Sequence, residues 1–200
     1  YLQQDGFLDK ELVRVADLDK KERPINQHWS WDRILRSPYI KQADTLQGFY
    51  FFEDHFTDEE LEKHFDFYEP FTVHESSLSP CVHSVQAAKL DRMEQAYTFY
   101  LRTSRLDLDD YNKEVEEGLH ITSMAGTWMS IVEGFGGMRV RDGKLCFAPK
   151  IPDQWEKYSF KINFRDRVLK VTVTQEGTTF DMNEGEALEI LVNGEPVQLS

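Results

Sequence analysis

The spacing of apolar residues changes at Gly136-Gly137, and this change limits the possible folds more than any other feature of the sequence. Before the glycine pair, apolar residues recur every three or four positions, as they do along one face of an amphipathic helix. After it they alternate with polar residues, for example over 158–164, which is typical of strands with one buried face. We therefore predict a helical part over residues 1–135 and a β module over residues 136–200.

Capping signals place several helix starts in the first part. Thr57 and Asp91 each stand three residues before a Glu, which is the arrangement of a capping box. Pro38 and Ser79-Pro80 precede apolar residues at helical spacing, and proline suits the first turn of a helix. A last helix is predicted to end near Phe135. Consecutive helical hairpins of this kind fit an arc of a larger ring of helices.

Two turn signals set the strand pairing that we expect in the β module. Asp142-Gly143 and Asn193-Gly194 stand between apolar stretches, and such pairs favour two-residue hairpin turns because both positions adopt positive φ readily. Alternation over 169–173 and 188–192 marks further strands. We predict antiparallel strands in a small sheet or sandwich.

Charge and cysteine content narrow the classes of partner. The 200 residues carry a net charge of −13, which disfavours nucleic acids and anionic membranes, and no apolar run approaches the roughly 20 residues that span a bilayer. Cys81 and Cys146 have no partner at metal-binding spacing, so we expect no metal site and a reducing compartment such as the cytoplasm. Because the sequence begins at Tyr1 without a Met, we expect it to be part of a longer chain.

Lys41 and Gln42 are the first candidate site residues, because they follow Pro38 in the predicted first turn of a helix. A lysine charge beside an amide donor can hold an oxyanion. The alternative is an ordinary solvated helix face, which spacing alone favours.

The segment 74–80 is a polar run directly before a predicted helix. It begins with His74 and includes the hydroxyls of Ser76 and Ser77. Hydroxyls at this place commonly cap a helix, and capping accounts for one of them. Helix capping and ligand binding therefore both remain open as roles for these hydroxyls.

The segment 120–126 also begins a predicted helix, with His120, Thr122 and Ser123 at its start. Free N–H groups and the positive end of the helix dipole favour an anion there, and the two hydroxyls add further donors. The alternative is a purely structural His120.

The stretch 107–118 is the most acidic part of the sequence. Its carboxylates are Asp107, Asp109, Asp110, Glu114, Glu116 and Glu117. We expect a solvated surface, although a sugar hydrolase on this chain would need one of these carboxylates as its general base.

Taken together, these segments resemble the inverting disaccharide phosphorylases, a family that includes maltose, trehalose and kojibiose phosphorylases. The resemblance extends over essentially all 200 residues and is specific as a combination of segments. The matching stretches are Trp29 to Arg33, Ser37 to Asp44, His74 to Pro80, Arg102 to Asn112 and Gly118 to Gly126.

The resemblance implies that residues 1–135 are the last third of an (α/α)6 catalytic barrel and that residues 136–200 are a C-terminal antiparallel β module. It implies cleavage of maltose by inorganic phosphate, with inversion, to β-glucose 1-phosphate and glucose. Phosphate is then a co-substrate, and no cofactor is expected. The general-acid Glu of the family is expected upstream of Tyr1, so this chain should be inactive alone. The remaining partners implied are the rest of the same barrel and a second subunit in a homodimer.

The resemblance also assigns phosphate or substrate binding to particular residues. They are Lys41, Gln42, His120, Thr122 and Ser123, and less directly Ser76 and Ser77. Trp29 and Trp31 are candidates for a sugar subsite, although we expect at least one of them in the core.

Three alternatives stay open at this stage. In the first, the substrate is another α-glucoside such as kojibiose, trehalose or nigerose. In the second, the enzyme is a hydrolase on the same barrel, with a base among Glu114, Glu116 and Glu117. In the third, the chain is a non-catalytic carbohydrate-binding or structural fragment.

Overall fold

The computed structural model describes residues 2–3, 5–110 and 113–200. Tyr111 and Asn112, which end one of the stretches that resemble the phosphorylases, lie outside the described residues. The helices are α1 (Ile25–His28), α2 (Trp31–Arg36), α3 (Asp44–Phe51), α4 (Asp58–Tyr68), α5 (Ser79–Lys89), α6 (Met93–Ser104) and α7 (Ile121–Met129), which continues as the π-helical turn η7 (Ser130–Phe135). Short 3-10 turns are η1 (Phe7–Asp9), η2 (Val15–Asp17), η3 (Lys20–Glu22), η4 (Glu53–His55), η5 (Glu69–Phe71) and η6 (Val115–Glu117).

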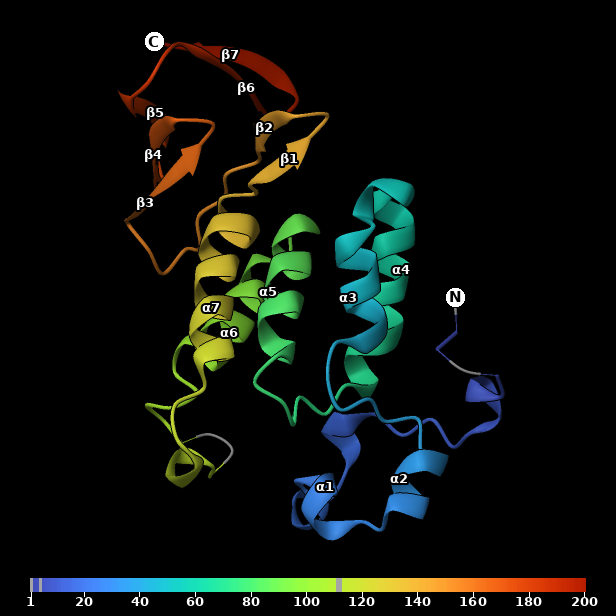
Figure 1. Ribbon diagram of the computed structural model, residues 1–200. Coiled ribbons are helices and arrows are strands. Elements are labelled where there is room, and N and C mark those ends of the chain that lie inside the picture. The colour runs from blue at the N-terminus through green and yellow to red at the C-terminus, as the bar shows by residue number, and fades with distance from the viewer. Residues whose placement is uncertain (1, 4, 111–112) are drawn as a thin grey trace.

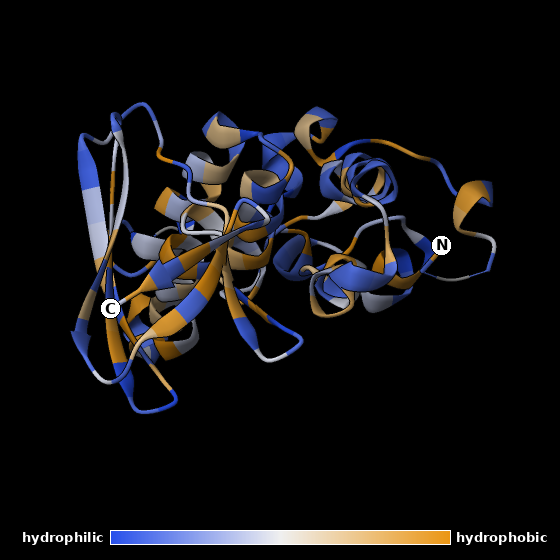
Figure 2. Cartoon of the chain, turned by 90° about the horizontal axis from the view of Figure 1, so that it is seen from above, coloured by the Kyte–Doolittle hydropathy of each residue, from blue (hydrophilic) through white to orange (hydrophobic). Residues whose placement is uncertain are grey.

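The helices α3 to α7 run roughly side by side, and the β module lies at one end of them (Figure 1). α3, α5 and α7 all begin at the opposite end, where α1 and α2 also lie (Figure 1). The segments that precede these three helices therefore meet at one end of the helical part. Seen from above, the two chain ends lie on opposite sides of the molecule (Figure 2).

The predicted starts of α4 and α5 are confirmed. The hydroxyl of Thr57 accepts the backbone N–H of Glu60, and the Glu60 carboxylate accepts the backbone N–H of Thr57, which completes a capping box. α5 begins at Ser79 with Pro80 in its first turn. Both helices contribute buried residues to one aromatic-rich core, with Phe65, Tyr68 and Val82 among them.

The capping box predicted at Asp91 is wrong. Asp91 has φ +59° and ends α5 in the left-handed conformation, and the N–H of Arg92 donates to the carbonyl of Ala87 at 2.8 Å. These are the marks of a Schellman-type helix end. Because Asp91 is used to end one helix, α6 begins later, at Met93, without a side-chain cap.

The helix predicted from Pro38 is also misplaced, since α3 begins only at Asp44. Ile40 instead forms a parallel bridge with Thr72. Its N–H donates to the carbonyl of Phe71, and its carbonyl accepts the N–H of Val73, both at 2.9 Å. Backbone groups used in this bridge cannot enter a helix, so Lys41 and Gln42 lie in the segment before α3.

The β module contains two sheets. One has the strand order β1 (Arg139–Arg141), β2 (Lys144–Phe147), β6 (Leu188–Val192), β7 (Glu195–Leu199), and the other is formed by β3 (Lys157–Phe164), β4 (Arg167–Thr174) and β5 (Gly177–Glu184). Their inner faces share a second core that includes Leu145, Leu169 and Ile190. A helical part followed by a small β-sheet module is thus confirmed.

The two predicted hairpin turns are present. Asp142 and Gly143 have φ of +49° and +75°, and Asn193 and Gly194 have φ of +51° and +85°. The expectation of wholly antiparallel strands is wrong for one pair, because β2 and β6 run parallel. β3, β4 and β5, which lie between β2 and β6 in the sequence, pair only with one another. The chain then returns to the first sheet, where β6 lies beside β2 and runs in the same direction.

The helical part and the β module share several contacts. Trp155 packs its ring against Tyr100 and Phe135, with ring centroids 5.1 Å apart in both pairs. The buried carboxylate of Glu53, at the end of α3, accepts hydrogen bonds from Arg139 at 2.5 and 3.2 Å. It also pairs with Arg141. These contacts fix the module against the ends of the helices.

Gly126 allows α7 to approach α5 closely. A Cβ atom at this position would lie 2.7 Å from the Cβ of Cys81, which is far inside the contact distance of two carbons. We expect Gly126→Ala to lower the free energy of unfolding by about 1–3 kcal/mol. Gly48→Ala on α3 is the matched control, because nothing lies within 4 Å of its added Cβ, and it should raise the free energy by up to about 1 kcal/mol. Urea unfolding measures both, and equal stability of the two variants would contradict the close approach.

Candidate functional site

Backbone pairing brings two of the predicted segments together. After the bridge between Ile40 and Thr72, the N–H of Glu75 donates to the carbonyl of Lys41 at 3.2 Å. The segment before α3 therefore lies along the segment before α5, in register. Lys41 and Gln42 stand beside Glu75 and Ser76 as a result.

Side-chain contacts then join these segments to the start of α7. The hydroxyl of Ser76 donates to the side-chain carbonyl of Gln42 at 2.9 Å. The hydroxyls of Ser77 and Thr122 are 3.1 Å apart. Lys41 and Thr122 are exposed, and Gln42 is partly exposed. Four of the seven predicted residues are thus joined at one open, polar face, and Lys41 is an exposed neighbour of Gln42 in the sequence.

His120 is held by Asp107, a residue of the acidic stretch that we expected to be solvated surface. Asp107 accepts the His120 backbone N–H at 3.0 Å and lies 2.6 Å from the ring Nδ1. The hydrogen bonds from His120 hold the pKa of the Asp107 carboxyl below its usual value. On the other side of the ring, Nε2 is 3.7 Å from a carboxylate oxygen of Glu114. Spacing gave no signal for Asp107, because it acts across a loop.

Ser123 points away from the polar face. Its hydroxyl donates to the carbonyl of Thr103 on α6 at 2.8 Å, and the residue is only 2% exposed. Its side chain is therefore directed at α6 and not at Lys41 or Gln42. Its N–H donates to the carbonyl of His120. Of the N–H groups at positions 120–123, that of Thr122 is the one with no acceptor among the described residues.

Two buried histidines lie close together, His74 at the start of the segment 74–79 and His83 on α5. The ring Nδ1 of His74 is 2.8 Å from the hydroxyl of Ser79, and the rings of His74 and His83 are 4.5 Å apart. Burial lowers the pKa of His74 well below its usual value and lowers that of His83 to about 4. Both rings are therefore neutral near pH 7 and add no charge to the polar face.

The two tryptophans of the family-like segment have different surroundings. Trp29 packs edge-on against Tyr39, with ring centroids 5.5 Å apart, and the Arg33 guanidinium lies over its ring. Trp31 is 76% exposed. Trp29 therefore belongs to the packed interior of the first segment, as expected for at least one of the two.

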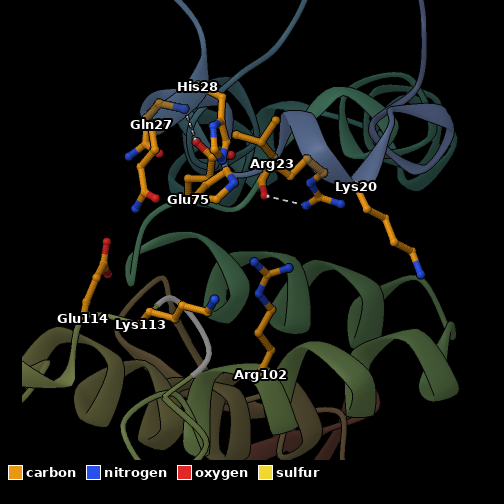
Figure 3. Close-up of a pocket in the computed structure, with 11 residues that line it drawn as sticks. Lys20, Arg23, Gln27, His28, Glu75, Arg102, Lys113 and Glu114 are labelled. Carbon is orange, nitrogen blue, oxygen red and sulfur yellow. Dashed lines mark hydrogen bonds between the residues drawn. The ribbon is translucent and has the colours of Figure 1, made fainter.

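A cavity of about 580 Å³ lies between residues 20–28 and the helical part that carries Arg102 (Figure 3). Glu75 and Glu114 line it, so it borders both the segment before α5 and the loop before α7. Its remaining walls come from residues 20–28 and from Arg102 on α6.

Among the described residues, no group of three or more His, Cys, Asp or Glu side chains is placed to hold a metal ion. No helix within the described ranges has both the length and the apolar character needed to cross a membrane. The polar face offers a lysine charge, an amide, hydroxyls and a helix N-terminus, a set that suits an oxyanion. The Asp44 carboxylate lies beside them and accepts the Gln42 amide N–H at 3.2 Å.

Comparison with known proteins decides the family. Residues 1–129 match the central catalytic domain of glycosyl hydrolase family 65, and residues 138–199 match the C-terminal domain of the same family. The chain belongs to glycosyl hydrolase family 65. Lys41, Gln42, Ser76, Ser77 and the start of α7 all lie in the part that matches the catalytic domain of family 65.

Relatives in family 65 confirm the resemblance seen in the sequence. Maltose phosphorylase of Bacillus subtilis (strain 168) is 55% identical over 199 residues, which cover 100% of this chain and 26% of that protein. An alpha,alpha-trehalose phosphorylase of Thermoanaerobacter brockii is 42% identical over 94% of this chain and 24% of that protein. A solved candidate kojibiose phosphorylase from the human microbiome superposes with a TM-score of 0.93 at 40% identity, covering 98% of this chain and 29% of the other. The chain spans about a quarter of the length of the two curated relatives.

Asp107→Asn tests the contact with His120. The depressed pKa of Asp107 means that its carboxylate stabilises the folded state above its ordinary pKa, and that this contribution is lost as the pH falls through the folded pKa. We expect the variant to melt at a lower temperature than the wild type at pH 6, and the difference to shrink below about pH 4. Thermal unfolding from pH 6 to pH 3 measures this, with Asp181→Asn on the exposed side of β5 as control. A difference that is the same at every pH would show that the carboxylate charge is not involved.

Proposed function

We propose that this chain is the phosphate-binding, C-terminal part of an inverting maltose phosphorylase. The observation that carries the proposal is the meeting of three separate segments at one polar face, through the Ser76–Gln42 and Ser77–Thr122 contacts. The 55% identity to a maltose phosphorylase over the whole chain supports maltose as the substrate. Kojibiose, trehalose and nigerose are the alternative substrates of the same chemistry.

Each residue has a distinct role in this proposal. Lys41 supplies the positive charge. The side-chain carbonyl of Gln42 accepts the Ser76 hydroxyl, its amide nitrogen donates to Asp44 at 3.2 Å, and the second N–H of that nitrogen donates to a phosphate oxygen. Ser77, Thr122 and the open N–H of Thr122 add donors at the start of α7, where the helix dipole favours an anion. His120, held by Asp107, lies at the edge of this group. Ser123 fixes the first turn of α7 to α6 through Thr103.

The reaction needs only positioning on this side of the sugar. Phosphate is already a nucleophile, so an inverting phosphorylase needs no carboxylate base to activate it, in contrast to an inverting hydrolase. Held on the face of the glucosyl ring opposite the leaving oxygen, phosphate attacks the anomeric carbon, and the bond to the departing glucose breaks. A general acid protonates that oxygen, and we propose that it comes from a part of the enzyme outside these 200 residues. The chain alone is then inactive.

An exposed apolar stripe supports the proposal that the helices are part of an (α/α)6 barrel. Ile121, Met124 and Trp128 lie at helical spacing on α7 and are 67%, 47% and 49% exposed. Large apolar side chains in such a row mark a surface that packs against another element. We propose that residues 1–135 complete a barrel whose other helices cover this stripe, and that residues 136–200 form the C-terminal module.

The two cysteines bear on the cellular compartment of the enzyme. Cys81 and Cys146 are both free, which fits a reducing compartment such as the cytoplasm. We propose a homodimer by analogy with the family.

A hydrolase on the same barrel is the second candidate, and the position of Glu114 favours it. Glu114 lies 3.7 Å from His120 and lines the cavity, so it is not a plain surface charge. Glu116 and Glu117 are exposed on η6. In the phosphorylase, Glu114 orients His120 and is not a base.

Lys41→Ala tests the phosphate site in the full-length enzyme. Loss of a charge-assisted hydrogen bond of about 1.5–3 kcal/mol should raise the KM for phosphate about 10-fold to 100-fold. The KM for maltose and the melting temperature should change little, because Lys41 is exposed. Lys63→Ala, at an exposed position on α4, is the matched control. An unchanged phosphate KM in Lys41→Ala would sink the proposed site.

Glu114→Gln separates the two enzyme classes. A phosphorylase should keep turnover that depends on phosphate, because no carboxylate base is required. A hydrolase should lose about 100-fold or more of a turnover that does not need phosphate. Glucose release from maltose, measured with and without phosphate in the wild type and the variant, decides between them.

A further inference from the structure

The cavity beside the polar face has features that the phosphate site does not use. Its volume of about 580 Å³ lies in the usual range of small-molecule sites, which is roughly 300–1,000 Å³. One wall is formed by residues 20–28, and the opposite wall by Arg102, Lys113 and Glu114 (Figure 3). Lys41, Gln42 and Thr122 are not among its lining residues. It is therefore a separate space that shares an edge with the phosphate site.

Two arginines are anchored to neighbouring carbonyls in this cavity. Arg23 donates from Nη2 to the carbonyl of Val73 at 3.4 Å, and Arg102 donates from Nη2 to the carbonyl of His74 at 2.8 Å. Figure 3 shows the two guanidinium groups approaching each other from opposite walls. Each guanidinium has five donors in a planar fork, so a bond to a carbonyl fixes its position without using the whole fork.

The charge of this cavity is positive. Lys20 and Lys113 also line it, and within the described residues Arg23, Lys20 and Lys113 have no carboxylate partner. The carboxylate of Glu75 is already used, because its two oxygens accept the N–H groups of Ile25 at 2.5 Å and Asn26 at 3.0 Å. Four cationic groups therefore line a space that has two carboxylates, Glu75 and Glu114, and this excess of positive charge favours a bound anion.

We propose that this cavity is a second anion site, which binds a phosphorylated sugar. The arginine pair would bind the phosphoryl group, because guanidinium forks match its oxygens. The volume exceeds what a phosphoryl group alone needs. Asn26, Gln27 and His28 on the same wall supply amide and imidazole groups for sugar hydroxyls. This site does not depend on the proposed phosphorylase function.

Calorimetric titration of the full-length protein with glucose 6-phosphate tests the proposal, and glucose is the matched neutral ligand. We expect glucose 6-phosphate to bind with an affinity that falls as salt rises, and glucose to bind at least 10-fold more weakly. Arg23→Gln should weaken glucose 6-phosphate at least 10-fold. Arg36→Gln, at an exposed arginine on α2 paired with Asp32, should leave binding unchanged. Lys41→Ala should also leave it unchanged, since Lys41 lies outside the cavity.

Variant stability is checked by the melting temperature. Lys113→Gln is the second variant, because Lys113 is exposed and its loss does not disturb a backbone contact; it should weaken binding severalfold in a folded protein. No binding of glucose 6-phosphate, equal binding of glucose, full binding in both Arg23→Gln and Lys113→Gln, or loss of binding in Lys41→Ala would each overturn the proposal. The phosphate KM of Lys41→Ala, measured separately, reports on the proposed phosphorylase site alone.

Discussion

The candidate site depends on a short stretch of backbone pairing between residues 40–41 and residues 71–75. Two hydrogen bonds at Ile40 and one at Lys41 hold these strands of chain in parallel. Backbone pairing sets register, and a shift by one residue would turn alternate side chains to the opposite side. Main-chain geometry therefore places Lys41 beside Glu75 and brings Gln42 to Ser76, and the identity of the polar side chains matters only after that geometry exists.

The sequence predicted those elements whose signals are local. The capping box at Thr57, the Ser79-Pro80 start and the Asn193-Gly194 turn depend on neighbours within a few residues, and the structure has all three. The capping signal at Asp91 failed because the same residue can end α5 or begin α6. In the folded chain it ends α5. The helix predicted after Pro38 failed because Phe71 and Val73, far along the chain, form the hydrogen bonds of the Ile40 backbone. The parallel pairing of β2 with β6 had no local signal at all.

The same division applies to the site. Hydroxyls and a lysine before helices were visible as residue types, and the topology, with α3, α5 and α7 all starting at one end, explains why they meet (Figure 1). The direction of an individual side chain was not visible. Ser123 differs from Thr122 by one position on α7, yet one hydroxyl is buried against α6 and the other is exposed. The contacts of Asp107 and Arg102 were also not visible, because they cross loops whose path the sequence does not specify.

The order of strands in the β module has a consequence for synthesis on the ribosome. β2 finds its inner neighbour, β6, only after the whole three-stranded sheet has been made. Until then, the edge of β2 beside Cys146 and Phe147 is without its partner, and unpaired strand edges are prone to join other chains. The small hairpins β3–β4–β5 can form early, because their contacts are close in sequence. The module as a whole therefore closes late, and a nascent chain stopped before Leu188 would present an open edge to its neighbours.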